Sequence, residues 1–439
     1  MGIGGGVEEE GLSMVRRLGR RARGLLRSPT LRNLFYLYAV QVANYLFPLF
    51  TLPYLARVLG PEALGKLALA QTLSLYLSML LEYSLSLSAA REVSKWRHQP
   101  QVLRGILSGV LVARGLLLLP AGAMALLALY LFPPLRGEAG LLGGSFFLAL
   151  GTGLSPAWFF QGVERMGAVA LMEFSVRFMA TLGIFVLVRS PAEMAWPLYL
   201  QGLAALAVGL VGFLWMVSWV GFRPGLGEGW VWLRRGFGLF LSRLVASLYT
   251  TANVLLVGFF LPPGQVALYS NAERLTRSLT PMWEPFNKLF LPRFSYLLEK
   301  NPLEATQLAR RVGVLTFLLG LVGAGGLTCA APLLVRVLLG PGYEGTVPLV
   351  RILAWLLPLV ALSNFLGIQW MLAQRMDRPF NIIIFVAGLL NVFLAFLTIP
   401  RYGALGMAWA VVLSEAWVTG AMVVYLWWKG RLPWRMHED

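Results

Sequence analysis

Eleven charged side chains lie within stretches that are otherwise apolar, and these residues are the most able to do chemistry. A charged group inside an apolar segment is costly unless it faces water or a partner, so each is a candidate for function. Three arginines, Arg114, Arg243 and Arg274, have no carboxylate four residues away that would neutralise them within a helix. A guanidinium binds phosphate through paired hydrogen bonds, so we expect an anionic, phosphate-bearing substrate. The full set is Glu82, Arg114, Glu173, Arg177, Arg243, Glu273, Arg274, Arg277, Glu284, Lys288 and Glu415.

The spacing of polar residues indicates which way these side chains point. Polar positions recur at intervals of three and four residues in four predicted helices, which places them on one face of each helix. We therefore expect four helices to present polar faces to a common centre. The stripes are Gln41, Asn44, Pro48 and Thr51; Gln71, Ser74, Ser78 and Glu82; Arg243, Ser247 and Thr250; and Arg274, Arg277, Pro281, Glu284 and Lys288.

Ion pairing within one helix is the alternative interpretation for three of the carboxylates. Such a pair neutralises itself and can serve helix packing alone. The pairs at this spacing are Glu173 with Arg177, Glu273 with Arg277, and Glu284 with Lys288.

We predict two roles for these side chains. The residues expected to bind substrate are Arg114, Arg177, Arg243, Arg274, Arg277, Lys288, Asn44, Gln41 and Gln71. The carboxylates expected to couple an ion or to gate the path are Glu82, Glu173, Glu273, Glu284 and Glu415.

Several kinds of chemistry are excluded by residue types that are scarce. Cys329 is the only cysteine, so the chain has neither an internal disulfide nor a cysteine-based metal site. The two histidines, His98 and His437, fall in polar connections, so no histidine relay crosses an apolar stretch. No phosphate-loop motif for ATP is present. We expect no catalytic residue, metal or cofactor, and an energy source that is a sodium or proton gradient, the substrate gradient or a partner.

The composition predicts a membrane protein built from helices. Of 439 residues, 58% are hydrophobic and 13% are charged, about half the charged share of a soluble protein. A membrane helix needs about 20 apolar residues, so twelve such helices leave only short connections. The predicted fold is an all-α polytopic membrane protein whose twelve helices begin near residues 33, 65, 105, 139, 168, 196, 237, 267, 312, 347, 380 and 404.

The distribution of lysine and arginine predicts the orientation. Twenty-four of these cations fall in the N-terminal arm, the tail and alternate connections, whereas only five fall in the remaining connections. The positive-inside rule then places both termini in the cytoplasm and makes the number of helices even. This pattern requires the polar segment from Tyr269 to Tyr296 to cross the membrane as the eighth helix. The net charge of +17 is explained by these loops, so we expect no nucleic-acid partner.

An internal repeat divides the chain. A shift of 202 positions pairs Pro61 with Pro263 and Glu82 with Glu284. Six helices in each repeat give both halves the same orientation, so the repeat is parallel and a substrate path would run between the halves. The predicted division is a basic arm at 1–31, an N-lobe at 32–222, a C-lobe at 223–430 and a cytoplasmic tail at 431–439.

Several motifs resemble those of Wzx-type O-antigen and polysaccharide flippases, members of the multidrug/oligosaccharidyl-lipid/polysaccharide exporter superfamily. The similarity is carried by Asn33 to Tyr38, by Leu52 to Gly65, by Pro156 to Met166 (PAWFFQGVERM), by Leu339 to Tyr343 and by Tyr402 to Gly406. It covers nearly the whole chain after the N-terminal arm, whose arginine-rich sequence departs from the usual short start.

This resemblance implies two MATE-like lobes of six helices, with a cationic central cavity and alternating access, in the bacterial cytoplasmic (inner) membrane. The implied substrate is an undecaprenyl-diphosphate-linked oligosaccharide moved from the cytoplasmic to the outer leaflet. Membrane lipids and the polysaccharide polymerase and chain-length machinery are the implied partners. The alternatives are a lipid II flippase or a cation-coupled multidrug exporter of the same superfamily. A membrane glycosyltransferase or polymerase is disfavoured because no long external loop is present, so we expect a transporter and not an enzyme.

Overall fold

The protein is helical throughout the part of the chain that the structure describes. The computed structural model describes residues 29–434, apart from the side chains of residues 29–46, 48, 49 and 249. Helices and short helical turns account for all of its regular structure, so the predicted all-α class is confirmed. Residues 1–28 of the predicted basic arm and residues 435–439 of the predicted tail lie outside this part of the chain.

The chain is described below as two halves that meet after α8. The first half contains α2 (Pro29–Glu82), α3 (Leu85–Lys95), α4 (Pro100–Leu131), α5 (Ala139–Gly153), α6 (Ala157–Gly162), α7 (Met166–Leu187) and α8 (Trp196–Val220). The second half contains α9 (Leu226–Thr250), α10 (Asn253–Phe260), α11 (Pro263–Arg277), α12 (Glu284–Lys300), α13 (Pro302–Leu334), α14 (Thr346–Leu353), α15 (Leu356–Asn364) and α16 (Asp377–Trp428).

The two longest helices each consist of two arms. Gly60 interrupts α2 with φ 71°, and Gly403 interrupts α16 with φ 60°. Glycine adopts these backbone conformations without the steric cost that a Cβ atom imposes. The chain can therefore reverse direction within a single residue in each of the two helices. A further break follows the second arm of α2, where Tyr83 and Ser84 have φ 47° and 55° before α3 begins.

The order of helices and breaks recurs along the chain. The first long helix after the broken pair begins at Pro100 in the first half and at Pro302 in the second, which is the shift of 202 seen in the sequence. The reversal at Gly60 corresponds in the same way to the start of α11 after Pro262. The break after Glu82 corresponds to the interruption between α11 and α12.

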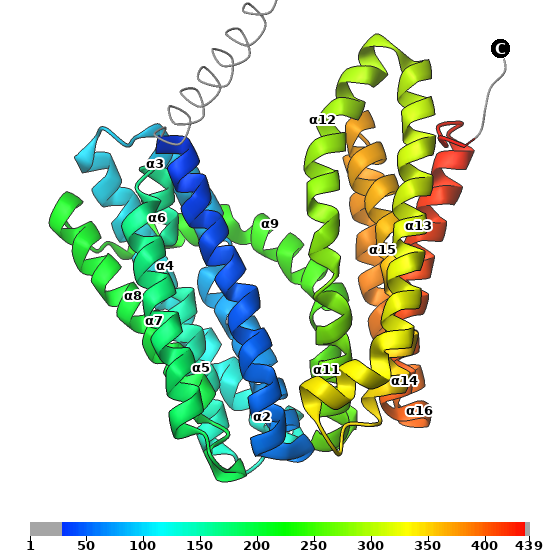
Figure 1. Ribbon diagram of the computed structural model, residues 1–439. Coiled ribbons are helices and arrows are strands. Elements are labelled where there is room, and N and C mark those ends of the chain that lie inside the picture. Colours follow the sequence, from blue (N-terminus) through cyan, green and yellow to red (C-terminus); the bar gives the residue numbers. More distant parts are fainter. Residues whose placement is uncertain (1–28, 435–439) are drawn as a thin grey trace, which may run out of the picture.

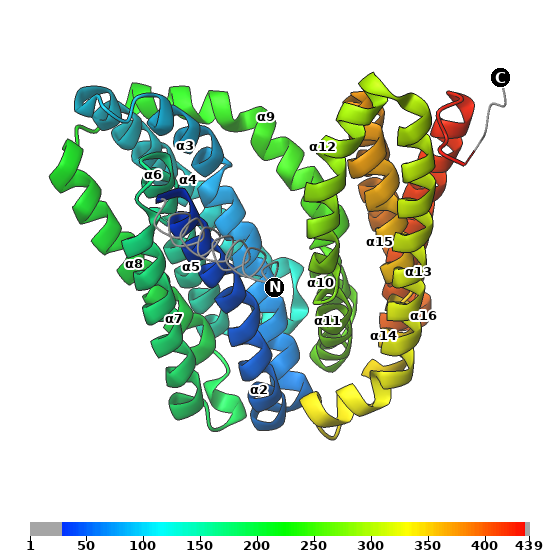
Figure 2. The same ribbon diagram turned by 45° about the horizontal axis from the view of Figure 1, so that its top comes forward.

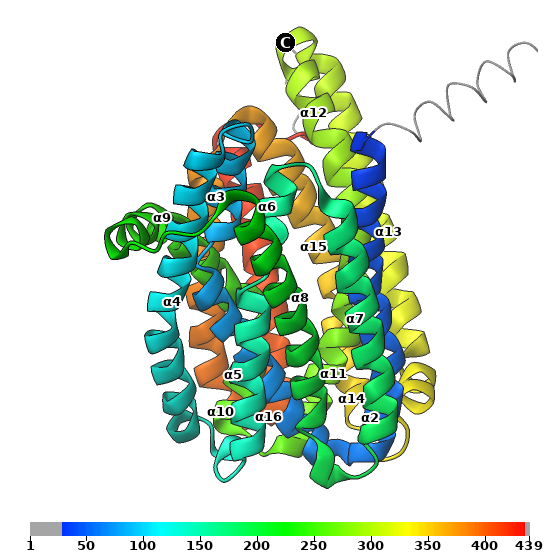
Figure 3. The same ribbon diagram turned by 90° about the vertical axis from the view of Figure 1, so that its left-hand side faces the viewer.

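The two halves meet at one end and separate at the other. Figures 1 and 2 show α2 to α8 on one side and α11 to α16 on the other, converging near the reversal of α2, while α9 passes between them. The separated end carries the turn between α12 and α13 and the end of α16. Figure 3, turned by 90°, shows the beginning of α9 projecting from the side of the bundle.

The buried apolar residues follow the same division. One large cluster contains residues of both halves, among them Leu52 of α2, Val266 of α11 and Leu339 just before the turn to α14. Two smaller clusters lie apart from it: one around Phe294 lies within the second half, and one around Trp158 lies within the first half and also includes Trp232 of α9. The halves therefore share a core at the converging end and keep separate cores at the other.

Close packing between helices depends on small residues, as expected where lipid removes the hydrophobic advantage of association. On α5, a Cβ atom added at Gly151 would lie 2.8 Å from the carbonyl oxygen of Gly202 on α8. These two glycines let the backbones approach directly and hold the first half together.

Eight of the described helices are long and apolar enough to cross a membrane. A ninth crossing results if α9 and α10, bent by 58° at their junction, count as one. This count is lower than the predicted twelve for two physical reasons. It counts Phe50–Lys95 as one helix and the two arms of α16 as another, and α11 with α12 carries too many charged side chains to qualify by composition.

Candidate functional site

Polar side chains from both halves meet where α2 passes α9 and α11. Arg274 of α11 donates a hydrogen bond from Nη2 to Oε1 of Gln71 on α2, at 3.2 Å. The Arg274 side chain is exposed, and its only polar partner among the described residues is this neutral amide. A guanidinium that keeps its full positive charge beside an amide is a suitable ligand for an anion.

A second contact between the halves joins two charged residues. Nη1 of Arg243 on α9 lies 2.8 Å from Oε2 of Glu82, the last residue of α2, with 50% and 28% of the two side chains exposed. The Tyr76 hydroxyl donates to the carbonyl oxygen of Ser247, one turn further along α9, at 3.0 Å. We call Gln71, Tyr76, Glu82, Arg243 and Arg274 the polar interface.

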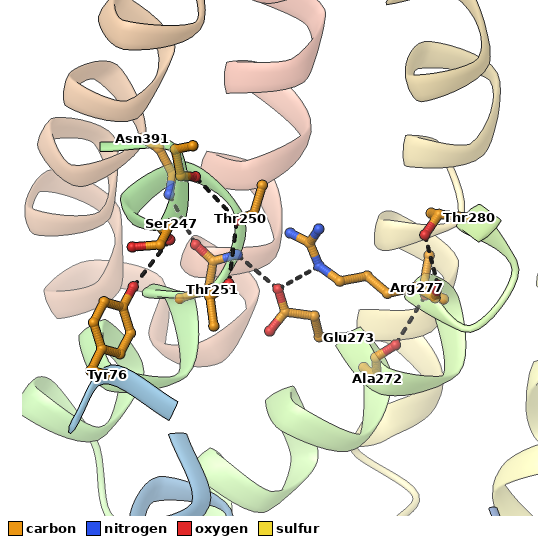
Figure 4. Close-up of polar contacts among 12 residues, drawn as sticks. Tyr76, Ser247, Thr250, Thr251, Ala272, Glu273, Arg277, Thr280 and Asn391 are labelled. Atoms are coloured by element: carbon orange, nitrogen blue, oxygen red, sulfur yellow. Dashed lines mark hydrogen bonds and ion pairs between the residues drawn. The ribbon is translucent and has the colours of Figure 1, made fainter. Parts of the chain in front are cut away.

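A buried hydrogen-bond network lies beside the polar interface, within the second half (Figure 4). Asn391 of α16 donates to Asn253 of α10 at 2.9 Å, and Asn253 donates to Oε1 of Glu273 on α11 at 2.8 Å. Nε of Arg277 reaches the same oxygen at 2.9 Å. Asn253, Glu273 and Asn391 are all buried, so the carboxylate of Glu273 is held by two donors away from bulk water.

The predicted ion pairs within helices are present for two carboxylates. Glu273 and Arg277 form the pair just described, and Lys288 of α12 lies 3.7 Å from Glu284, with most of both side chains exposed. The structure thus brings Arg243 and Arg274 to the polar interface and Arg277 to the buried network beside it.

The end where the halves converge is closed by backbone contacts. Nη2 of Arg57 on α2 donates to the carbonyl oxygen of Val337 at 2.6 Å. The buried hydroxyl of Tyr343 donates to the carbonyl oxygen of Ala56 at 3.0 Å. Gly65 of α2 lies so close to α11 that an added Cβ atom would be 1.8 Å from the carbonyl oxygen of Pro263.

Arg114 lies away from the polar interface, inside the first half. It is 1% exposed and donates to the carbonyl oxygen of Ser155, at 3.2 Å, and to Oγ of Ser86, at 2.9 Å. Ser155 lies in the break between α5 and α6, so Arg114 satisfies a carbonyl group that the break leaves without a helical partner. These contacts suit a structural role better than the predicted role in substrate binding.

The remaining candidate residues are dispersed. Glu415 of α16 is buried and accepts a hydrogen bond from Ser363 of α15 at 2.5 Å, within the second half. Glu173 and Arg177 lie half-buried on α7. The predicted stripe on α2 is divided, because Ser78 turns to Thr152 of α5 at 2.6 Å. The side chains of Gln41 and Asn44 lie outside the described part of the structure.

Several residues of the site were not predicted from the sequence. The two asparagines of the buried network, Asn253 and Asn391, and the hydroxyl of Tyr76 contribute polar contacts but carry no charge. A search for uncharged polar residues isolated in apolar stretches would have found both asparagines. Arg57 and Tyr343 were noted only as parts of motifs, although they join the two halves.

Two surface hollows lie outside the polar interface. One of about 420 Å³ lies between α3, α4 and α9 and is lined by Glu92, Trp96 and Arg235 among others. The other, of about 400 Å³, lies beside Lys66 and Pro263 at the converging end. Within residues 29–434, no three side chains of histidine, cysteine, aspartate or glutamate are grouped so that they could hold a metal ion.

Known proteins similar in sequence are named for polysaccharide export. The family described as polysaccharide biosynthesis protein matches residues 30–298. A protein of Escherichia coli (strain K12), provisionally named an O-antigen transporter, is 30% identical over 408 residues, covering 90% of this chain and 96% of that protein. A protein of Shigella dysenteriae with the same name is 26% identical over 390 residues, covering 88% of this chain and 96% of that protein.

Solved structures of membrane transporters share the fold. The lipid II flippase MurJ, in an inward closed conformation, matches with a TM-score of 0.65 and 14% identity, covering 90% of this chain and 87% of its own. An inward-facing multidrug resistance MATE family transporter of the MOP superfamily matches with a TM-score of 0.57 and 17% identity, covering 88% and 94%. At these identities the similarity shows a common fold.

Proposed function

Because the chain belongs to the polysaccharide biosynthesis protein family, we propose that it is a flippase for an undecaprenyl-diphosphate-linked oligosaccharide, such as an O-antigen repeat unit. The chain is a multi-pass membrane transporter and not an enzyme, consistent with relatives that are named transporters. The observation that carries the choice of substrate is Arg274, an exposed guanidinium between the halves whose partner is neutral. An anionic headgroup is the ligand that such a cation would stabilise most.

The proposed topology has twelve crossings with both termini in the cytoplasm. Counting the arms of α2 and α16 separately supports this number, as does a crossing by α11 with α12. The cation-rich connections, including the turn at Lys300, lie at the end where the halves separate (Figure 1). By the positive-inside rule this end faces the cytoplasm, and the closed end at Gly65 faces outward.

In this arrangement the substrate enters from the cytoplasmic side. The diphosphate binds Arg274 together with Arg277 and Arg243, the glycan lies between the halves, and the polyprenyl tail stays in lipid. Closure of the cytoplasmic end and opening of the contacts around Arg57 would then expose the headgroup to the outside. In this alternating access the two halves rotate as rigid bodies, so that one end closes while the other opens. A cationic site disfavours the cation-coupled drug exporter as an alternative, because cationic drugs require carboxylates.

Energy coupling in this proposal depends on Glu273. Its carboxylate is held by Asn253 and Arg277, so a sodium ion or a proton arriving there would change the partner of Arg277. Ion binding would thereby alter the charge offered to the substrate. In the cell, the product would pass to the polysaccharide polymerase and chain-length machinery in the same membrane.

The direct test is flipping by purified protein in vesicles. Undecaprenyl-diphosphate-linked sugars would be supplied with and without a sodium or proton gradient, and outward movement would be followed by accessibility to an external lectin. Each charge-assisted hydrogen bond contributes about 1.5–3 kcal/mol, so Arg274→Ala should lower the rate about ten-fold or more. Arg274→Lys retains the charge but not the paired geometry and should lie in between.

Arg401→Ala is the matched control, because Arg401 is an exposed arginine on α16 outside the polar interface. It should flip lipid at the wild-type rate. Flipping by Arg274→Ala at the wild-type rate would refute the proposed binding site. Absence of flipping by the wild-type protein, with every gradient tried, would refute the proposed function.

A further inference from the structure

Glu82 occupies an unfavourable position for a carboxylate. It is the last residue of α2, so its charge lies at the negative end of the helix dipole. It is also 28% exposed and interacts across the interface with Arg243, at 2.8 Å. A carboxylate so placed is stabilised by a nearby cation.

The backbone next to Glu82 is fixed against α9. Tyr83 and Ser84 are left-handed, with φ 47° and 55°, so the chain changes direction directly after the carboxylate. The ring of Tyr83 stacks on Phe240 of α9, with the ring centroids 4.4 Å apart and the planes 16° apart. Phe240 is one turn from Arg243, so the stacking holds Glu82 beside its partner.

Arg114, a second cation without a carboxylate partner, contacts the chain segment that follows Glu82. Arg114 is 1% exposed, both of its hydrogen bonds go to uncharged oxygens, and its Nε atom has no partner among the described residues. One of those oxygens belongs to Ser86, two residues after the break that follows Glu82. A buried guanidinium is stabilised strongly by a nearby carboxylate.

We propose that Glu82 is an exchangeable counter-ion. In the empty transporter it pairs with Arg243, an anionic phosphate group displaces it from Arg243, and Arg114 then pairs with the released carboxylate. This inference rests on the proposed function, in which Arg243 binds the diphosphate. It makes Glu82 and Arg114 positioning residues, since neither contacts the substrate. Glu82 adjoins the break between α2 and α3. Its movement on substrate binding would therefore also shift the backbone at that break.

If the exchange occurs, removing the negative charge of Glu82 should increase the affinity for the anionic ligand. An exposed ion pair is weak, so Glu82→Gln should free Arg243 and tighten anion binding about two- to five-fold. Arg243→Ala should weaken binding, and the double variant should match Arg243→Ala alone. Glu62→Gln removes a carboxylate that is 77% exposed at the converging end and serves as the control for a change in net charge.

The role of Arg114 is tested in two backgrounds. With Glu82 present, Arg114→Gln removes the cation that receives the carboxylate, so it should weaken binding about two- to five-fold. In the Glu82→Gln background the same substitution should have no effect, because no carboxylate remains to be moved. A purely structural role would weaken binding equally in both. If Arg114→Gln does not fold, Arg114→Lys is used instead: it keeps a cation to receive the carboxylate, so it should bind as the wild type does, and weaker binding by Arg114→Lys in both backgrounds would contradict the exchange.

Binding would be measured on purified full-length protein with undecaprenyl diphosphate, phosphatidylglycerol and inorganic pyrophosphate. Tighter binding of undecaprenyl diphosphate and pyrophosphate by Glu82→Gln, with Glu62→Gln unchanged, supports the exchange. Equal binding by Glu82→Gln and the wild type overturns it. If phosphatidylglycerol binds as tightly as undecaprenyl diphosphate, the proposed function fails. The exchange still stands in that case, provided that pyrophosphate binding responds to Glu82→Gln.

Discussion

The contact between Gly65 and Pro263 offers a way to open the closed end by adding one methyl group. A Cβ atom at Gly65 would lie 1.8 Å from the carbonyl oxygen of Pro263 and 3.1 Å from the backbone nitrogen of Ala267. Non-bonded atoms pack at about 3.5–4 Å, so α2 and α11 would have to move apart by roughly 1.5 Å or more. Overpacking of this kind costs about 1–3 kcal/mol, and Gly65→Ala should lower the population of this closed arrangement about ten-fold or more.

The assay is the labelling rate of a cysteine at Val266, a buried residue of α11, by a maleimide added outside the cell. The exposed native Cys329 is first replaced by serine. Gly65→Ala should label about ten-fold faster or more than the parent. Gly264→Ala is the matched control, since a Cβ atom there meets nothing within 4 Å. Equal labelling of the Gly65→Ala and parent proteins, both folded by thermal melting, would show that this contact does not hold the end closed.

Three further outcomes are expected. Reporter fusions should read cytoplasmic after Lys300 and external after Pro263, and a cytoplasmic signal at Pro263 would contradict the twelve-crossing topology. Arg277→Ala leaves the buried carboxylate of Glu273 without its charged partner, so it should lower the free energy of unfolding by about 1–3 kcal/mol, and Glu273→Gln combined with Arg277→Ala by less. Tyr343→Phe removes one buried hydrogen bond worth about 1 kcal/mol, so it should speed labelling at the closed end less than Gly65→Ala does.

Much of the fold could be predicted because apolar length and turn residues are local signals. The reversal at Gly60 directly precedes a proline, and α11 begins directly after Pro262. These two helix boundaries can therefore be predicted from the sequence. The interruptions inside segments are different. Nothing in the sequence around Tyr83 and Ser84 requires left-handed backbone, because that conformation is imposed by packing against Phe240 of another helix.

The site divides in the same way. The pair of Glu273 with Arg277 was predictable because both residues lie on one helix at a fixed spacing. Arg243 has no carboxylate four residues away on its own helix, which suggested a guanidinium free for substrate. Its partner, Glu82, lies 161 residues away in the chain, and only the folded arrangement brings the two together. Spacing along one helix cannot reveal a counter-ion supplied by another.

The path of α9 has a mechanical consequence for the whole molecule. Its early part packs on α4, where Gly229 lies against Val112, and so travels with the first half. Beyond its end, Asn253 is tied by hydrogen bonds to Glu273 and Asn391 and so travels with the second half. Any rocking of one half against the other must bend the chain between Gly229 and Asn253, which includes the 58° bend between α9 and α10. That segment is the flexure joint of the molecule, and the motion of either half relative to the other depends on it.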